Sequence, residues 1–201
     1  VINNLLNCIS DIINKVDAVI ISDYGKGVVN QVILKKAIAL ANKKGIPINV
    51  DPKIENFLSY KKVSCITPNL SEAIAGMRWL EVSDDKDVIE LGRKILKRLQ
   101  SKSVLITRGE KGMSLFQPGD KLTHIPTRAR EVYDVTGAGD TVIATFTLAL
   151  AAGAAFNEAA EISNFAAGIV VGKLGTAVTS VDEINSAILS YKNGKKGRKV
   201  L

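Results

Sequence analysis

Short apolar runs alternate with longer amphipathic segments along most of the chain. The apolar runs at 16–22, 46–50, 63–67 and 103–109 have the length of buried strands. Apolar residues recur at helical spacing in 29–45 and 85–100, and further helices are predicted at about 138–152, 157–172 and 181–191. Strands that alternate with helices predict an α/β fold, in which right-handed crossovers connect the strands of a mostly parallel central sheet.

One stretch departs from this alternation. Residues 112–126 contain two short runs of strand character separated by Pro118-Gly119-Asp120, which is typical of a hairpin turn. His124, the single histidine of the chain, falls in the second run. A Ser-His-Asp triad or a zinc site would need partners that this region lacks, so we expect no catalytic role for His124.

Polar, turn-forming residues follow each of the four predicted buried strands. The carboxyl ends of parallel strands meet at one edge of a sheet, where open α/β sheets bind their ligands. These segments therefore predict a ligand crevice, although strands also commonly end in polar turns that bind nothing. The segments are Ser22-Asp23-Tyr24-Gly25-Lys26, Asp51-Pro52-Lys53, Thr67-Pro68-Asn69 and Thr107-Arg108-Gly109.

The net charge of +7 is concentrated at the end of the chain. Without the five basic residues of the stretch 192–199, the remaining charge is +2. Aromatic residues are only 5% of the chain and none lies within this basic stretch, so nucleic acid is not an expected partner. We expect a folded domain over 1–191 and a basic flexible tail, or the start of a linker, over 192–201.

The apolar content and the cysteines indicate where the protein works. Hydrophobic residues make up 46% of the 201 residues, which is enough for a core. Cys8 and Cys65 have no metal-ligand spacing, as expected for a reduced cytoplasmic protein. The longest uncharged run, 141–157, is shorter than the ~20 residues that span a bilayer, so we expect a buried helix and no membrane partner.

A glycine-rich segment, DVTGAGDT at 134–141, precedes this uncharged run. It does not match the dinucleotide fingerprint, because Val142 occupies the position of the third glycine. The nearest approach to a Walker loop, at 168–174, has only three residues between its glycines and Leu174 in place of the magnesium-binding hydroxyl.

The chemistry of this segment suits phosphoryl transfer. Glycines allow successive N–H groups to converge on an anion, and the positive end of a helix dipole favours the same charge. Asp140 would lie in the first turn of the helix, where its carboxylate could accept the proton of an attacking hydroxyl. From the residues alone, Asp140 could equally be a cap of a core helix.

Six segments together resemble the ribokinase-like (PfkB) sugar kinases, and within that family the heptose 7-phosphate kinases. They are SDYGKG, DPK, TPNLSE, TRGEKGMSLFQPG, EVYDVTGAGDTVIA and AAGIVVGKLGT, and they extend the resemblance from about Asp17 to Leu189. The resemblance implies a ribokinase-like three-layer sandwich. It also implies transfer of a phosphoryl group from ATP to the C1 hydroxyl of a heptose 7-phosphate, with another sugar or nucleoside kinase, or an inactive fragment, as alternatives.

The resemblance also assigns roles to single residues. Asp140 is the implied catalytic base, and Gly137, Ala138 and Gly139 form the implied anion hole. Substrate candidates are Asp23, Lys26, Asp51 and Lys53, and a monovalent cation such as K⁺ is implied near Asp134 and Thr136. The segment at 69–72 also reads as a helix start, with Asn69 as its cap. ATP and Mg²⁺ are assigned to Asn69, Leu70, Ser71, Glu72, Thr107, Arg108 and Gly109.

Members of this family are longer than the present chain, at roughly 300 residues. We therefore expect that the first strands of the fold and its β lid are not included here. The same reasoning predicts that most sugar contacts, and the dimer contacts that the lid makes in relatives, belong to that part.

Overall fold

The computed structural model describes residues 1–129 and 131–197, and these form a single six-stranded sheet in the order β1 to β6. Strands β1 to β4 run parallel, whereas β5 and β6 are antiparallel and form the predicted hairpin. The mostly parallel sheet is therefore confirmed. The strands are β1 (Val19–Ser22), β2 (Ile48–Asp51), β3 (Cys65–Ile66), β4 (Ser103–Thr107), β5 (Met113–Gln117) and β6 (Lys121–Ile125).

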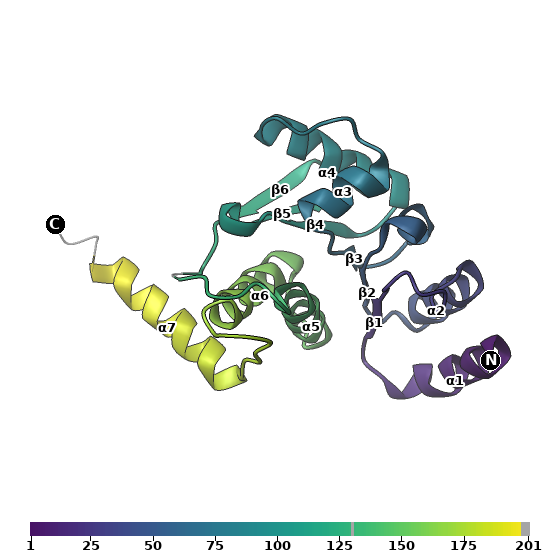
Figure 1. The fold of residues 1–201 in the computed structure, drawn as a ribbon. Helices are drawn as coiled ribbons and strands as arrows, with labels where there is room; N and C mark the ends of the chain where they lie inside the picture. Colours follow the sequence, from purple (N-terminus) through teal and green to yellow (C-terminus); the bar gives the residue numbers. More distant parts are fainter. Residues whose placement is uncertain (130, 198–201) are drawn as a thin grey trace.

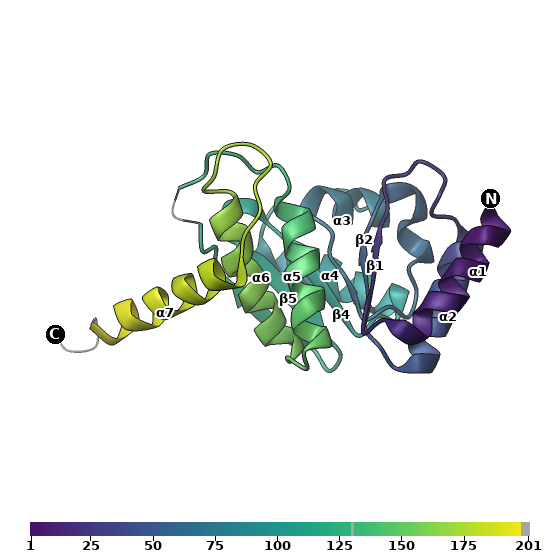
Figure 2. The same ribbon diagram turned by 90° about the horizontal axis from the view of Figure 1, so that it is seen from below.

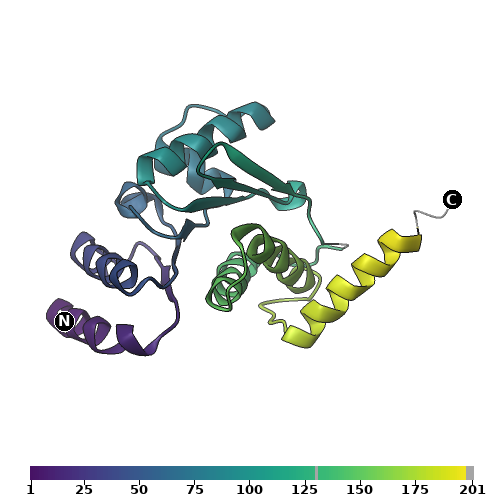
Figure 3. The same ribbon diagram turned by 180° about the vertical axis from the view of Figure 1, so that it is seen from behind.

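Helices cover both faces of the sheet and complete a three-layer sandwich (Figures 1 and 2). One face carries α2 (Gln31–Lys44), α3 (Leu70–Met77) and α4 (Asp85–Leu99), and the other carries α5 (Ala138–Ala151) and α6 (Phe156–Val170). Helix α1 (Ile2–Ile12) packs beside α2, and α7 (Val181–Gly197) packs beside α6 with its C-terminal end projecting away (Figure 3).

Each layer of helices has its own apolar core against the sheet. Successive side chains of a strand point to opposite faces, so Val104 and Ile106 of β4 join one core and Leu105 joins the other. The first core is closed by α2 to α4, and the second by Val142 and Phe146 of α5. This two-sided burial explains why the strands appear in the sequence as nearly continuous apolar runs.

A buried polar contact fixes α5 to the sheet. Asn49 Nδ2, in β2, donates a hydrogen bond to Thr147 Oγ1, in α5, over 2.8 Å. Both residues are almost completely buried, so each needs the other as a hydrogen-bonding partner. The bond sets where α5 lies along β2.

Several element boundaries differ from the predicted ones. β1 starts at Val19 rather than residue 16, because a short 3₁₀ helix at Ile13–Lys15 precedes it. The apolar pattern predicted no element for α1, which packs mainly on α2, or for the 3₁₀ helix Ile54–Ser59. Helix α7 continues past its predicted end at 191 to Gly197, and 198–201 of the predicted tail lie outside the described residues. Among the described helices, none has the length and apolar character that crossing a bilayer requires.

Candidate active site

The carboxyl ends of the parallel strands lie side by side. Ser22 of β1 pairs in register with Asp51 of β2, and the Thr107 N–H donates to the Pro68 carbonyl over 3.0 Å. The polar segments that follow β1 to β4 therefore meet at one edge of the sheet, as expected from a parallel arrangement.

Charged side chains gather at this edge around Asp51. The pKa of the Asp51 carboxyl is raised to about 6, mainly by burial and in part by negative charge on Glu72, Asp140 and Asp23, whereas Lys53 opposes the change. Asp51 is therefore within electrostatic range of the other three carboxyls. The fold thus brings Asp140 of α5 close to residues from three separate strand ends.

Glu72 joins this cluster to the start of α3. Its Oε1 lies 2.8 Å from Lys53 Nζ, and its Oε2 accepts the Asn69 backbone N–H over 3.0 Å. The Asn69 side chain in turn accepts the Glu72 N–H over 2.8 Å, which completes a capping box. The cap and the position beside Lys53 are therefore both present, and Ser71 is exposed in the same first turn.

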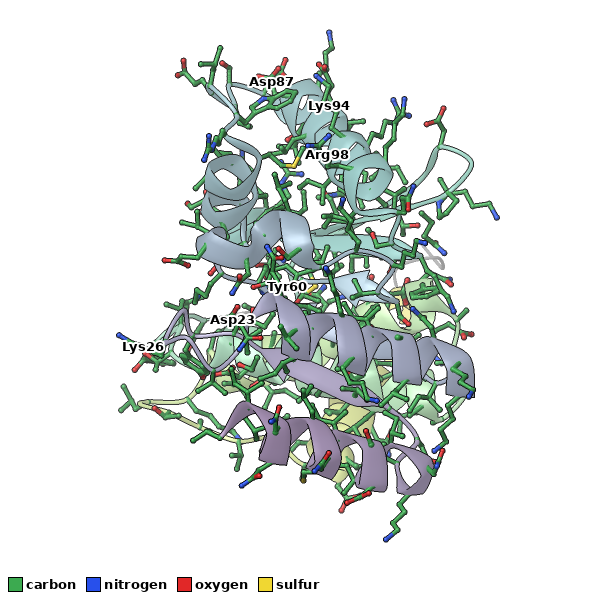
Figure 4. All side chains as sticks on the ribbon, turned by 90° about the vertical axis from the view of Figure 1, so that its right-hand side faces the viewer. Asp23, Lys26, Tyr60, Asp87, Lys94 and Arg98 are labelled. Carbon is green, nitrogen blue, oxygen red and sulfur yellow. The ribbon has the colours of Figure 1, made fainter. Side chains whose placement is uncertain are left out.

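Asp23 is buried, and its hydrogen bonds stabilise the loop that follows β1. Its carboxylate accepts hydrogen bonds from the Tyr60 hydroxyl over 2.6 Å, from Asn56 Nδ2 over 2.9 Å and from the Gly25 N–H over 2.8 Å. Burial alone would raise the Asp23 pKa, but these bonds lower it. Figure 4 shows Asp23 close to Tyr60, with Lys26 further out on the same loop. Asp23 thus supports the loop, and Lys26 is exposed to solvent.

The glycine segment forms the beginning of α5. Gly137 precedes the helix with φ of +80°, a left-handed conformation that glycine adopts without steric cost. Gly139 and Asp140 are exposed in the first turn, and nothing lies within 4 Å of where a Gly139 Cβ would be. Since Gly137 is the residue before the helix and has no side-chain cap, Asp140 does not take the N-cap position.

A cavity of about 580 Å³ opens beside this helix start. Its lining is predominantly apolar and comes from the β4–β5 turn, the segment before α5, and helices α5 and α6. Thr107 and Gly109, Ala138 and Gly139 are among the lining residues. The cavity therefore connects two of the predicted nucleotide residues to two residues of the predicted anion hole, whereas the predicted segment Asn69 to Glu72 is not part of its lining.

Comparison with known proteins gives the family of this chain. Residues 3–183 match the family described as "pfkB family carbohydrate kinase". The chain belongs to the pfkB family.

Curated relatives and solved structures agree with this membership. "Bifunctional protein HldE" of Alcanivorax borkumensis is 46% identical over 92% of this chain, and that of Actinobacillus succinogenes is 45% identical over 92%. The chain spans only 37% and 38% of the lengths of these two relatives. Arabidopsis thaliana ribokinase complexed with ribose and ATP superimposes with a TM-score of 0.76 at 22% identity, covering 90% of this chain and 58% of that one.

A second solved structure has the same fold. Phosphofructokinase-2 from Escherichia coli in complex with potassium gives a TM-score of 0.78 at 21% identity, covering 90% of this chain and 60% of that one. The ribokinase-like sandwich implied by the motifs is therefore confirmed.

Arg108 does not line the 580 Å³ cavity, although the residues before and after it in the chain, Thr107 and Gly109, do. The Arg108 side chain is 5% exposed, and its guanidinium pairs with Asp85 at the start of α4 and donates to Ser114 Oγ over 3.3 Å. The Arg108 side chain lines a separate cavity of about 210 Å³, together with Leu70. The Arg108 side chain therefore connects the β4–β5 turn to α4 and β5 rather than to the larger cavity.

The predicted cation residues lie beside the anion hole. Asp134 Oδ1 accepts the Thr136 N–H over 2.8 Å, and hydrogen bonds from Thr136 and the Gly175 backbone lower the Asp134 pKa. Thr176 also approaches Gly137, with its Cγ2 3.7 Å from where a Cβ would be. The fold thus brings the loop 172–176 next to the turn that begins at Asp134.

Several cavity residues were missed by the sequence analysis. None of the following cavity residues was a candidate site residue, although Gly168, Val132 and Val135 lie within the motif segments: Asn164 and Gly168 of α6, and Thr127, Ala129, Val132 and Val135 before α5. Gly112 is the one with a sequence signal, because its φ is +76° and a Cβ there would lie 2.1 Å from the Ile125 carbonyl oxygen. A lone glycine after a turn is too common to identify a site, so only the fold shows its importance.

Proposed function

We propose that this chain carries the nucleotide-binding and catalytic part of an ATP-dependent sugar kinase. The proposed reaction transfers the γ-phosphoryl group of ATP to the C1 hydroxyl of D-glycero-D-manno-heptose 7-phosphate, giving the 1,7-bisphosphate and ADP. Membership of the pfkB family and the sequence identity with the HldE relatives support a carbohydrate kinase. The six motifs support the heptose, and hence a step of ADP-heptose synthesis for the lipopolysaccharide core.

One observation carries the proposal. The start of α5 borders the 580 Å³ cavity through Ala138 and Gly139, and the charge of the exposed Asp140 beside them acts on Asp51 of the charged cluster. A phosphoryl donor in the cavity and an acceptor above the cluster would therefore meet at this helix start. This is the arrangement that in-line phosphoryl transfer requires.

The cavity suits the nucleoside of ATP. Apolar side chains from Val132, Val135, Val142 and Val171 provide surfaces on which a base can pack. From there the phosphates can extend to the N–H groups at the start of α5, where the helix dipole adds positive potential. These N–H groups would stabilise the charge that develops on the transferred phosphoryl oxygens.

Asp140 is the proposed base. As the sugar C1 oxygen attacks the γ-phosphorus, its proton passes to the Asp140 carboxylate. The bond between the γ-phosphorus and the bridging oxygen breaks, and ADP leaves with that electron pair. The exposure of Asp140 in the first turn leaves its carboxylate available to a substrate.

The residues present fit a magnesium ion. Asp51, Glu72 and Asp140 concentrate negative charge on oxygen atoms, the ligand type that Mg²⁺ prefers. Over 1–129 and 131–197, no three carboxylate, histidine or cysteine side chains are grouped closely enough to hold a metal by themselves. This agrees with an ion bound mainly through water and ATP phosphates, with Asn69 and Glu72 as outer partners. When bound, Mg²⁺ neutralises phosphate charge; a monovalent cation would be held by Asp134, Thr136 and the 172–176 loop.

The test is to incubate the chain with Mg-ATP and β-heptose 7-phosphate and follow the products by ³¹P NMR. Formation of a 1,7-bisphosphate and ADP would support the proposal. Parallel reactions with ribose, fructose 6-phosphate and a nucleoside distinguish the heptose from other pfkB substrates. ATP binding without turnover on any acceptor would assign to this chain only the nucleotide half of the site.

A further inference from the structure

The segment at 126–135, here called the strap, separates two cavities. It connects β6 to α5, and all of it except residue 130 lies within the described part of the chain. On one side, Thr127, Ala129, Val132 and Val135 line the 580 Å³ cavity. On the other side, Arg128, Glu131 and Tyr133 line a second cavity of about 450 Å³, whose other walls are α6 and α7.

Helix α6 holds both ends of the strap. Asn164 Nδ2 donates to the Pro126 carbonyl over 2.7 Å, and the Tyr133 N–H donates to the Val171 carbonyl over 2.8 Å. Gly168 lets the strap lie directly on the helix, because a Cβ at that position would be 2.9 Å from the carbonyl carbon of Arg128. These contacts fix the ends and the base of the strap but involve no residue of α7.

Arg128 provides the link to α7. Its guanidinium carbon lies 3.9 Å from the centre of the Tyr191 ring, in α7, and 5.1 Å from the centre of the Phe165 ring, in α6. The two rings contact each other edge to face, with 5.7 Å between their centres. A guanidinium against two aromatic rings is held by cation–π attraction and by packing of its planar surface.

We propose that Arg128 is a positioning residue for nucleotide binding, and that it couples the docking of α7 to the affinity for ATP. Its side chain occupies the α7 side of the strap, while the neighbouring Thr127 and Ala129 form the wall of the opposite cavity. Because one short backbone segment carries both sets of side chains, losing the Arg128 stack would change the shape of the wall between the ends that α6 holds. This inference rests on the proposed function, since it takes the 580 Å³ cavity as the nucleotide site.

The coupling must act in both directions. If docked α7 favours the cavity shape that binds ATP, then bound ATP favours docked α7 by the same factor. Nucleotide should therefore slow amide hydrogen exchange in the Tyr191 region of α7, although α7 contributes no residue to the cavity lining. A direct ATP contact by Arg128 would not produce this second effect.

The experiment measures ATP and sugar-phosphate dissociation constants by calorimetry for Arg128→Ala, Tyr191→Ala and the double variant. Each single substitution is expected to weaken ATP binding about fivefold, with sugar-phosphate binding unchanged. The double variant should be no weaker than the weaker single one, because both remove the same stack. Leu189→Ala is the matched control, since that α7 side chain is 60% exposed, and it should bind ATP as the original chain does.

The outcomes separate this inference from the proposed function. If the original chain binds no ATP, both fail. If it binds ATP and Tyr191→Ala binds equally well, only the coupling is wrong. Additive losses in the double variant would also contradict it, because the two residues would then act separately. Should Tyr191→Ala be poorly folded, the ATP-dependent hydrogen exchange of α7 in the original chain decides: no slowing overturns the coupling.

Discussion

Lys53 Nζ lies 2.8 Å from Glu72 Oε1, while the other carboxylate oxygen of Glu72 caps the first turn of α3. The Glu72 side chain therefore makes both a capping hydrogen bond and an ion pair. Two substitutions distinguish the contributions of these two contacts. Glu72→Ala removes both and should cost about 0.3–1.5 kcal/mol of folding stability through the lost capping box. Glu72→Gln keeps an oxygen for the Asn69 N–H, so its melting temperature should stay close to the original.

Glu72→Gln should nevertheless need about tenfold more magnesium for half-maximal turnover, because it lacks the charge that orders the ion's water shell. Titration of activity with Mg²⁺ at saturating ATP measures this. An unchanged magnesium requirement would show that Glu72 serves only as a cap.

Asp140→Asn tests the proposed base. The carboxylate is exposed and is not the N-cap of α5, so the variant should fold normally and bind ATP within a few-fold of the original. Turnover should fall by about 10²–10⁴ because the amide cannot accept the hydroxyl proton. Glu161→Gln, at an exposed position of α6, is the matched control. Normal turnover by Asp140→Asn would contradict the assignment.

The two glycines before Asp140 should respond differently to alanine. At Gly137, φ of +80° makes a Cβ unfavourable, and Gly137→Ala should lose about 1–2 kcal/mol of folding stability. At Gly139 a Cβ meets no described atom, so Gly139→Ala should keep its melting temperature. It should still bind ATP poorly, because the added methyl group would occupy the space of the phosphates. Thermal unfolding and calorimetry together test the pair, and tight ATP binding by Gly139→Ala would place the phosphates elsewhere.

Asp51 predicts a pH-dependent stability. Its pKa in the folded protein, about 6, is above the ordinary value of 3.8, so ionising it costs folding free energy at higher pH. The cost begins near pH 4 and is complete above pH 6, where it reaches at most about 3 kcal/mol. Without magnesium, Asp51→Asn should therefore raise the melting temperature at pH 7.5, and the gain should shrink as pH falls towards 4. An equal gain at both pH values would contradict the electrostatic cause.

Arg108 should matter for folding rather than for nucleotide contact. Its guanidinium is buried against Asp85 and Ser114 and faces away from the larger cavity. Arg108→Ala should lower the melting temperature by roughly 2–6 °C, with the ATP dissociation constant within about threefold of the original. Loss of ATP binding at an unchanged melting temperature would instead favour the nucleotide role that the motif resemblance implies.

The sequence predicted the parts of this fold that depend on local pattern. Buried strands and amphipathic helices follow from the spacing of apolar residues, and the polar strand ends meet because parallel strands align. Helix α1 was missed although apolar residues recur along it at helical spacing, and β3, with two residues, is shorter than its apolar run.

The site was predictable only where a motif carries it. Gly137 to Asp140 could be proposed as a candidate site because glycine and aspartate have definite chemistry at a helix start. The direction of the Arg108 side chain depends on Asp85, which is 23 residues earlier in the chain, and the strap depends on glycine and aromatic residues of α6 and α7. Such contacts between distant segments are decided by tertiary packing, which no local pattern records.

The hydrogen bond between Asn49 and Thr147 has a consequence for how this site can evolve. Asn49 is two residues before Asp51, and Thr147 is two turns after Asp140, so one buried bond sets the spacing of both carboxylates. A substitution at Asn49 or Thr147 would therefore shift Asp51 relative to Asp140. Selection on the proposed reaction would therefore also act on two buried side chains of the core.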